Sequence, residues 1–561
     1  NGKLDRQALP APDWEAGKTV EYQPPESETE QRLAAIWCEL LGLDKVSRQD
    51  NFFELGGHSF IALSLVAKLN ELGSALTVRD VFSSPILSDM ASSITTLERP
   101  SSIASPSLIP EGCPHITPEM LPLVSLTQIQ IDQVATSLKP SSIYNIYPLS
   151  PLQNGFLLMH RLHQDQDYYI LRTLLKFDSR SHWNKFATAF QRIIERHDIL
   201  RTSFHWRGLP QPIQVVSRSA QIRTREIALK EGQDALTKLD IETNLNKIKI
   251  NLNQAPLVNF VLSEDKGSKE CFVAILNHHI IEDNYSLKIL LRECFMIMEG
   301  REKELLPPVP YSDFISETLS SAHEKETFFQ TRRLSQEGFK PLFGAGTFKR
   351  NKTIREAKCV LEKSLENQLR YISRISGTSP AVFLHAAWAL AVGQQKDCKE
   401  FFIGTILSGR GQSGSSVDRA VGMFINLLPM KFNLNATAKE IIKETKLELN
   451  TLLKYEQCSL CEAKDVSCIK EHEIPFSTII NYRHNDLEDL SPNSAKGLQY
   501  KFGITQIKSD ERTHFPLALF VDESSDCFEF CIQSATDECP SDFLASLLHS
   551  IDWILSALEK K

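Results

Sequence analysis

The chain has 561 residues, of which 42% are hydrophobic and 24% charged, and its net charge is −8. This length exceeds what one hydrophobic core can organise, so we expect two to four domains. The acidic balance disfavours nucleic acid and anionic membrane surfaces as partners, and no segment reaches the roughly 18 uninterrupted apolar residues of a membrane span. The N-terminus has neither an initiator Met nor a signal-peptide layout, so we expect an excised piece of a longer cytoplasmic protein.

Twelve cysteines are scattered along the chain, as expected of a protein in a reducing compartment. One group, which comprises Cys458, Cys461, Cys468 and His472, has a spacing that zinc ligands also show. It lies in a segment with helical periodicity, and no second Cys-x2-Cys pair completes a zinc finger. We therefore interpret these cysteines as buried or half-buried thiols and assign no metal.

Residues 1–25 are predicted to be an extended linker, because they are polar and contain Pro10, Pro12, Pro24 and Pro25. The first six residues, Asn-Gly-Lys-Leu-Asp-Arg, also resemble the last motif of adenylation domains, in which the lysine contacts the acyl-adenylate. This stretch would then be the C-terminal remnant of such a domain. Because the sequence does not contain the rest of that domain, we assign no activity to its lysine.

Residues 26–98 are predicted to form a small, compact all-α bundle. The apolar periodicity predicts one helix over Thr29–Leu41, a second over Ser59–Leu72, and a short third helix after Thr77. This stretch holds 11 acidic and 5 basic side chains, a net charge of −6. Such a charge suits a mobile domain that docks on several partners, although a solvated acidic face has the same composition.

The stretch 50–60 within this bundle reads Asp-Asn-Phe-Phe-Glu-Leu-Gly-Gly-His-Ser-Phe. Ser59 follows the Gly-Gly turn, and the apolar residues Ile61 and Leu65 predict a helix that begins there. The positive end of the helix dipole favours a phosphate ester on such a hydroxyl group; a serine that caps an ordinary helix is the alternative. The stretch resembles the phosphopantetheine attachment site of peptidyl carrier proteins from non-ribosomal peptide synthetases. The resemblance implies that Ser59 bears covalent 4′-phosphopantetheine, added by a phosphopantetheinyl transferase.

Residues 99–140 are predicted to be a flexible linker rich in Ser, Pro and Thr, followed by a helical lead-in over Leu126–Thr136. Residues 141–561 alternate strand-like and helix-like patterns and are longer than a typical domain, so we expect two α/β subdomains of similar size. The predicted strands are Tyr169–Phe177, Phe272–Leu276, Phe401–Ile406, Phe515–Val521 and Cys527–Gln533, and the predicted helices are Trp183–His197, Ser286–Glu299, Thr378–Val392 and Asp542–Leu558.

The sequence Asn-His-His-Ile-Ile-Glu-Asp-Asn over residues 277–284 directly follows one of these predicted strands. A strand that ends in two histidines directs one imidazole beyond the sheet, and histidine is suited to proton transfer near neutral pH. Asp283 can turn back and hold the loop. For His278 and His279, a metal-binding pair and a core histidine are the alternatives.

Further motifs accompany this one in a fixed order. They are Tyr147-Pro-Leu-Ser-Pro-Leu-Gln-x-Gly155, the segment 196–202, Tyr311-Ser-Asp-Phe314, Gly404-Thr-Ile-Leu-Ser-Gly-Arg410, Val421-Gly-Met-Phe-Ile-Asn-Leu-Leu-Pro429 and Asn481-Tyr-Arg483. Together the series resembles the condensation domains of non-ribosomal peptide synthetases, over essentially all of residues 114–561.

The resemblance implies two chloramphenicol-acetyltransferase-like subdomains with a tunnel between them, in which a donor arm and an acceptor arm meet at His279. The implied reaction is attack of the acceptor amine on the donor thioester, in which His279 acts as base or positions the amine. His278 is assigned to the catalytic residues with it. The resemblance gives Asp283 a structural role as the partner of Arg410. For this buried pair we expect a bidentate clamp.

Two departures from the family pattern bear on this site. Asn284 stands where the family has Gly, and we expect the turn to survive because Asn tolerates left-handed backbone better than most residues. The segments 116–123 and 206–210 resemble the subgroup that both epimerises the donor and condenses it. That subgroup carries a further His-His segment, which is degenerate over residues 159–167 because Arg161 replaces one histidine. We expect retained epimerisation, with a plain condensation domain as the alternative.

The expected function is that of a carrier–condensation didomain that forms amide bonds. Its expected partners are the transferase, an upstream adenylation domain, downstream adenylation and carrier domains of the same synthetase, and aminoacyl or peptidyl thioesters. A non-catalytic condensation-like platform that recruits partner enzymes is the first alternative. A domain for cyclisation and release, or for epimerisation alone, is the second.

Overall fold

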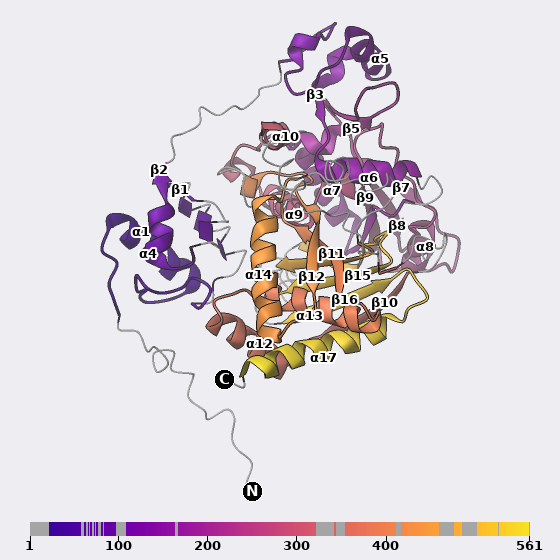
Figure 1. Cartoon of the computed structure of the whole chain (residues 1–561). Helices are drawn as coiled ribbons and strands as arrows, with labels where there is room; N and C mark the ends of the chain where they lie inside the picture. Colours follow the sequence, from indigo (N-terminus) through magenta and orange to yellow (C-terminus); the bar gives the residue numbers. More distant parts are fainter. Residues whose placement is uncertain are drawn as a thin grey trace. The chain divides into compact units, whose positions relative to one another are not determined.

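The structure is a computed structural model that describes most of the chain. The described residues are 22–55, 57, 61–62, 65–66, 68–69, 72, 74–76, 80–81, 84–96, 108–162, 167–320, 342–343, 354–410, 417–458, 476–484, 502–524 and 527–559. The chain divides into one unit over Asn1–Leu97 and Arg374–Thr378 and a second unit over Glu98–Ser373 and Ser379–Lys561 (Figure 1). Lys3, Cys461, Cys468 and His472 lie outside the described residues.

The first unit has a small helical core, as predicted. Helix α1 (Glu28–Leu41) begins where the Ser27 side chain accepts a hydrogen bond from the amide of Glu30, and it ends at Gly42, whose φ of 65° suits glycine. The other described elements are helix α4 (Leu87–Ser93) and the two-residue strands β1 (Ser74–Ala75) and β2 (Thr95–Thr96). Trp37 and Phe52 are fully buried in this core, with ring centroids 5.1 Å apart.

The second unit begins with residues that the sequence assigned to a linker and a helical lead-in. The lead-in is helix α5 (Gln128–Leu138), which follows the short 3-10 helix η1 (Pro118–Met120). Ile109, Ile131 and Val134 are buried in one cluster with Ile143 and Val215. The last two residues belong to a three-stranded sheet of order β3-β6-β5, formed by β3 (Ile143–Pro148), β6 (Ile213–Ser217) and β5 (Thr202–His205). Residues 108–138 therefore form a packed extension of this sheet.

A five-stranded sheet of order β14-β4-β9-β8-β7 organises the first lobe of this unit. Its strands are β4 (Ile170–Phe177), β7 (Arg223–Ile227), β8 (Val258–Glu264), β9 (Cys271–His278) and β14 (Ile504–Asp510). The lobe also contains α6 (Pro151–Leu162), α7 (Arg180–Arg196), α8 (Ala235–Glu242), α9 (Asn284–Met298), α10 (Tyr311–Ser320) and the 3-10 helices η2 (Pro140–Ser142), η3 (Asp198–Arg201), η4 (His279–Ile281) and η5 (Glu302–Glu304).

A six-stranded sheet of order β10-β16-β15-β13-β11-β12 organises the second lobe (Figure 1). Its strands are β10 (Arg355–Val360), β11 (Glu400–Leu407), β12 (Asn426–Asn433), β13 (Thr478–His484), β15 (Leu517–Glu523) and β16 (Phe528–Ser534). The lobe also holds α12 (Lys363–Ile375), α13 (Pro380–Gln395), α14 (Ala438–Lys454), α17 (Pro540–Glu559) and the 3-10 helix η6 (Val417–Arg419). Helix α13 is buried all round because α14 and α17 pack against it.

The two lobes have separate hydrophobic cores, which confirms the expected pair of α/β subdomains. One strand joins them, since β14 comes late in the chain but pairs antiparallel with β4 of the first lobe, Ile504 opposite Phe177 and Asp510 opposite Arg172. On its other side β4 pairs with β9, and Ile170 of β4 lies opposite His278 of β9. Because β9 is a central strand of the sheet, this pairing places its end, and with it the His-His segment, in the middle of the sheet.

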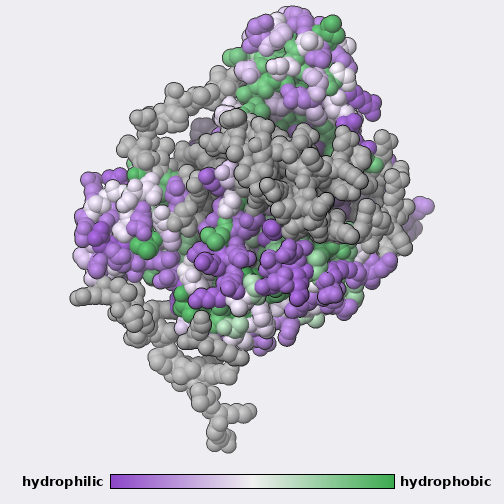
Figure 2. Space-filling model, in the orientation of Figure 1, coloured by the Kyte–Doolittle hydropathy of each residue, from purple (hydrophilic) through white to green (hydrophobic). Residues whose placement is uncertain are grey.

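The surface view shows mainly hydrophilic residues with smaller hydrophobic groups between them (Figure 2). Some large apolar side chains are exposed, among them Ile129 of α5 at 81%. In the part of the chain that the structure describes, no single helix is long and apolar enough to cross a membrane, and one bent pair, α12 with α13, passes that test by length and composition alone.

Candidate active site

The attachment serine predicted in the first unit, Ser59, lies outside the described residues, but the turn before it is partly described. The amide of Gly57 donates to the carbonyl of Phe52 at 2.9 Å. A Cβ atom at position 57 would lie 2.4 Å from the Phe52 ring, so this position requires glycine. Residues 61–62, 65–66 and 68–69 are helical, and Ala62 and Leu65 are fully buried. A tight turn and a helix thus flank, along the chain, the segment that contains Ser59.

In the second unit, the chain turns sharply at the end of strand β9. The Nδ1 atom of His278 accepts a hydrogen bond from the amide of Ile280 at 3.0 Å and so caps the 3-10 helix η4. The amide of His279 donates to the carbonyl of Tyr169 at 2.8 Å, which extends the ladder to β4 by one bond. The side chains of His278 and His279 consequently lie in different surroundings.

His279 is half-buried, and its ring has one defined tautomer. Its Nδ1 atom lies 2.7 Å from the carbonyl oxygen of Glu282. A carbonyl can only accept, so Nδ1 carries the proton and the neutral ring keeps a lone pair on Nε2. The ring also packs on Phe156 of α6, with centroids 5.4 Å apart. His279 therefore presents a proton acceptor held in a fixed orientation.

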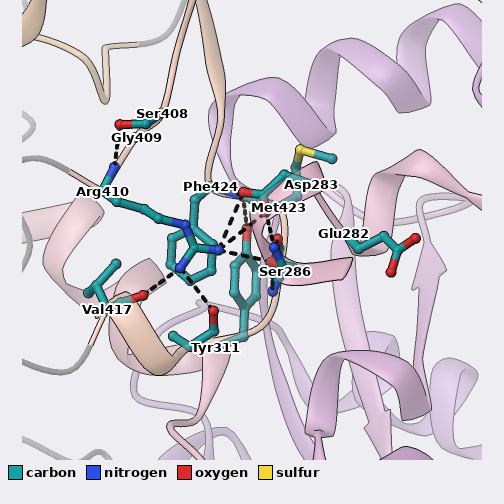
Figure 3. A network of polar contacts seen from close by, with 12 residues as sticks. Glu282, Asp283, Ser286, Tyr311, Ser408, Gly409, Arg410, Val417, Met423 and Phe424 are labelled. Carbon is teal, nitrogen blue, oxygen red and sulfur yellow. Dashed lines mark hydrogen bonds and ion pairs between the residues drawn. The ribbon is translucent and has the colours of Figure 1, made fainter. Parts of the chain in front are cut away.

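Asp283 and Arg410 form the predicted buried pair, with side chains 1% and 2% exposed (Figure 3). Asp283 caps helix α9 by accepting from the amide of Ser286 at 2.7 Å, and it accepts from the amide of Phe424 at 3.2 Å. Arg410 Nη2 donates to the two carboxylate oxygens at 3.2 and 3.5 Å and to the Ser286 hydroxyl at 2.9 Å. The pair joins η4 and α9 to the segment after β11.

The expected bidentate clamp is wrong in its geometry. Arg410 uses one nitrogen, Nη2, for Asp283, because Nη1 donates to the carbonyls of Val417 and Ala420. The left-handed backbone that we gave as the reason for the turn to survive at Asn284 is not used. Asn284 is the first residue of α9 and is not among the described residues with positive φ, since the Asp283 cap leads directly into the helix.

His278 is fully buried behind His279 and belongs to a cluster with Asp167 and His160. Asp167 Oδ2 lies 2.7 Å from His160 Nδ1 and 3.2 Å from His278 Nε2. Burial raises the pKa of Asp167, but the hydrogen bonds from the two histidines outweigh it and hold that pKa well below the usual range. Burial also lowers the pKa of His278. The cluster is thus a carboxylate between two imidazoles.

These three side chains lie close enough together to suggest a metal site. The tautomer of His278 argues against that use. Since its Nδ1 accepts from the Ile280 amide, its Nε2 must carry the proton in the neutral ring and has no lone pair for a metal. The geometry fits a carboxylate that is hydrogen-bonded to His160 and lies in contact with His278.

Two cavities meet at His279, and both are lined by residues from the two lobes. One, of about 520 Å³, we call the polar cavity because most of its lining residues are polar or charged, and it has Asn277, Glu282 and strands β10, β15 and β16 in its walls. The other, of about 590 Å³, is mainly apolar and lies between α6 and strands β12 and β13. His278 is not among the described residues that line either cavity. His279 therefore lies in the walls of both cavities.

Comparison with known families shows which family the chain belongs to. Residues 143–558 match the condensation domain family, and residues 31–94 match the phosphopantetheine attachment site family. The chain belongs to the condensation domain family. With its carrier domain, it is a carrier–condensation didomain of the non-ribosomal peptide synthetase type, and its carrier family confirms 4′-phosphopantetheine as the covalent cofactor.

The relatives of this didomain are much longer proteins. It is 37% identical to malpinin synthetase of Mortierella alpina over 576 residues, which covers 100% of this chain and 7% of that protein. It is 36% identical to malpibaldin synthetase of the same organism, covering 95% of this chain and 10% of that protein. It is 24% identical to gramicidin S synthase 2 of Brevibacillus brevis, covering 98% and 12%. The chain thus spans about a tenth of the curated relatives that it matches.

Solved structures support the condensation fold. The X-domain from teicoplanin biosynthesis superposes with a TM-score of 0.60 at 17% identity, covering 74% of this chain and 95% of that one. The starter condensation domain of rhizomide synthetase RzmA, a mutant in complex with C8-CoA, superposes with a TM-score of 0.59 at 16% identity, covering 76% and 96%.

Sequence reasoning missed several residues that hold the condensation site together. Gln153 donates to the carbonyl of Ile280 at 2.9 Å and so supports η4 from helix α6. The Ser286 hydroxyl donates to the carbonyl of Gly422 at 2.7 Å. Gln153 lies in a motif that the sequence analysis singled out, but its contact is 127 residues away along the chain, which no spacing reveals.

Proposed function

We propose that this didomain forms an amide bond between a donor thioester carried on Ser59 and the amine of an acceptor carried by a downstream carrier domain. The observation that carries this proposal is the position of His279, a half-buried imidazole with its Nε2 lone pair free, where two cavities meet. The phosphopantetheine arm, attached by a phosphopantetheinyl transferase, supplies the thiol that holds the donor.

The role that we give His279 is to accept the proton of the attacking amine. The two cavities bring the reacting groups together, which replaces a bimolecular encounter by a positioned one. Glu282 holds the ring through its backbone carbonyl, and we propose that Asp283 and Arg410 act structurally by fixing that loop. Adenylation domains upstream and downstream in the same synthetase would supply both aminoacyl groups. The ten cysteines described in the structure are free thiols, in keeping with the cytoplasmic location that we propose.

The test is a single-turnover reaction read by intact-protein mass spectrometry. Ser59 is loaded with a synthetic aminoacyl arm, and a carrier-bound acceptor is offered. His279→Ala should lower product formation by about 100-fold or more, while loading of Ser59 stays unchanged. His549→Ala, an exposed histidine on α17, is the matched control. Equal rates in both variants would favour the alternative of a non-catalytic platform or a domain for cyclisation and release.

A second proposed activity is epimerisation of the donor before condensation. The specific observation in its favour is the cluster of His160, Asp167 and His278, two of whose members, His160 and Asp167, lie in the degenerate segment 159–167. His160 Nδ1 donates to the ionised Asp167, so its Nε2 can accept a proton from the donor α-carbon. Helix α6, which carries His160, also lines the apolar cavity through Leu158 and Met159.

Deuterium wash-in at the α-carbon of an L-aminoacyl donor on Ser59, with no acceptor present, tests this activity. Exchange in the unmodified chain and its loss in His160→Ala would support it. An exchange rate equal to that of a free thioester, together with an all-L product, would leave a plain condensation domain.

A further inference from the structure

Glu282 is a buried carboxyl group in the wall of the condensation site to which no role has yet been given. Its residue is 4% exposed, and it lines the same polar cavity as His279. Its Oε1 atom accepts a hydrogen bond from Asn277 Nδ2, and Asn277 lines that cavity as well. Glu282 is extended, with φ −154° and ψ 153°, and its carboxyl group points away from the network around Arg410 (Figure 3).

This carboxyl group is held in a protonated form. Among the described residues, no lysine or arginine forms an ion pair with it, and a buried carboxylate without a cation is costly. Burial, with a smaller contribution from the adjacent Asp283, raises the pKa of Glu282 to about 8. At neutral pH it therefore carries an O–H group, a hydrogen donor that an ionised glutamate lacks.

We propose that Glu282 is the proton donor of the condensation site, giving its proton to the departing sulfur of the donor thioester while His279 accepts the proton of the amine. The C–N bond forms as the C–S bond breaks, and the sulfur leaves as a thiol. The proton then on His279 returns to Glu282 through solvent, so no proton is gained or lost. This inference rests on the proposed function of His279.

In this proposal one short loop supplies both the proton acceptor, His279, and the proton donor, Glu282. The backbone carbonyl of Glu282 fixes the His279 tautomer, and the same residue lines the cavity that His279 lines. Positioned general acids and bases contribute on the order of 100-fold or more to a reaction rate. Apart from Asp283 and His279, the other charged or titratable residues that line this cavity are Glu356, Lys358, Cys359, Arg483, Glu511, Asp522, Glu529 and Cys531.

Several of these neighbours are already neutralised by one another. Arg483 donates to Asp522 at 2.8 and 2.7 Å and to Glu511 at 2.7 Å, and Lys358 lies 3.0 Å from Glu356. They consequently offer Glu282 little positive charge that would ionise it. A pH profile of condensation can therefore report on this carboxyl group.

The experiment compares the unmodified chain with Glu282→Gln in single-turnover condensation between pH 6 and 10, with Ser59 loaded in both. The unmodified chain should lose rate as pH rises through about 8, where the donor proton is lost. Glu282→Gln should be on the order of 100-fold slower at pH 7 and should lack that fall. Glu444→Gln, an exposed glutamate on α14, is the matched control and should behave as the unmodified chain.

A readout independent of activity accompanies the kinetics. Infrared spectroscopy should show the carbonyl band of a protonated carboxyl group at pH 7 in the unmodified chain and its loss in Glu282→Gln. Absence of that band overturns the inference even if the variant fails to fold. A slower variant with an unchanged pH profile also overturns it, because a structural role would do the same. If the band is present but neither chain forms product, the proposed condensation activity fails instead, and the donor role fails with it.

Discussion

Replacing Arg410 by methionine tests whether the buried pair with Asp283 is structural. Methionine keeps an unbranched chain beside the rings of Tyr285 and Phe424, on which the guanidinium lies at 4.5 and 3.9 Å. It leaves Asp283 buried, with two backbone amides as partners and no cation. Removing one member of a buried pair costs about 3–5 kcal/mol, since the other charge stays uncompensated.

The expected change in melting temperature follows from the size of the unit. Unfolding entropy is about 2.1 cal/mol/K per residue, which for the roughly 460 residues of the second unit is about 1 kcal/mol/K. Arg410→Met should therefore lower the melting temperature by about 3–5 °C in differential scanning calorimetry. Arg301→Met removes a guanidinium that is 49% exposed and pairs with Glu304, and its melting temperature should match that of the unmodified chain.

A double variant separates structure from chemistry. Asp283→Asn combined with Arg410→Met removes both charges and should recover part of the loss in melting temperature. A single Arg410→Met variant that melts like the unmodified chain but condenses slowly would refute the structural assignment. The pair would then act on the reaction itself.

The remaining predictions concern the carrier and the pH dependence of stability. Incubation with coenzyme A and a phosphopantetheinyl transferase should add the mass of one arm to the unmodified chain and none to Ser59→Ala; an equal mass gain in both would falsify the attachment site. Glu282 should make stability pH-dependent, because its folded pKa of about 8 lies above the unfolded value of 4.5. Its stabilising contribution is full below pH 4.5 and is lost as pH rises towards 8, on the order of 3 kcal/mol by pH 7. Thermal melts of Glu282→Gln should accordingly fall less between pH 5 and 8 than those of the unmodified chain, and identical slopes would count against a buried neutral carboxyl group.

The elements that could be predicted from sequence are those with a strong apolar pattern. The predicted strand Phe272–Leu276 is the centre of β9 (Cys271–His278), and the predicted helix Trp183–His197 is α7 (Arg180–Arg196). Strands β10 and β14 were missed because they lie at sheet edges. Their sequences, Arg-Glu-Ala-Lys-Cys-Val and Ile-Thr-Gln-Ile-Lys-Ser-Asp, are largely polar and exposed, as edge strands often are.

The sequence predicts those site residues that lie close together along the chain. His279 and Asp283 stand in one short motif, and Arg410 came from the resemblance rather than from spacing. The link between His278 and Asp167 spans more than 100 residues and depends on the pairing of β4 with β9, which local patterns do not contain. The prediction of a bidentate pair between Asp283 and Arg410 was wrong for a similar reason. The carbonyls of Val417 and Ala420 accept hydrogen bonds from the second guanidinium nitrogen.

The pairing of β14 with β4 has a consequence for how this protein is made. About 330 residues separate the two strands, so a ribosome releases β4, β8 and β9 long before the edge strand that completes their sheet. Until β14 has been made, one edge of β4 has no partner strand and can pair with strands of other chains. The time needed to translate residues 178–503 therefore sets how long that edge stays open.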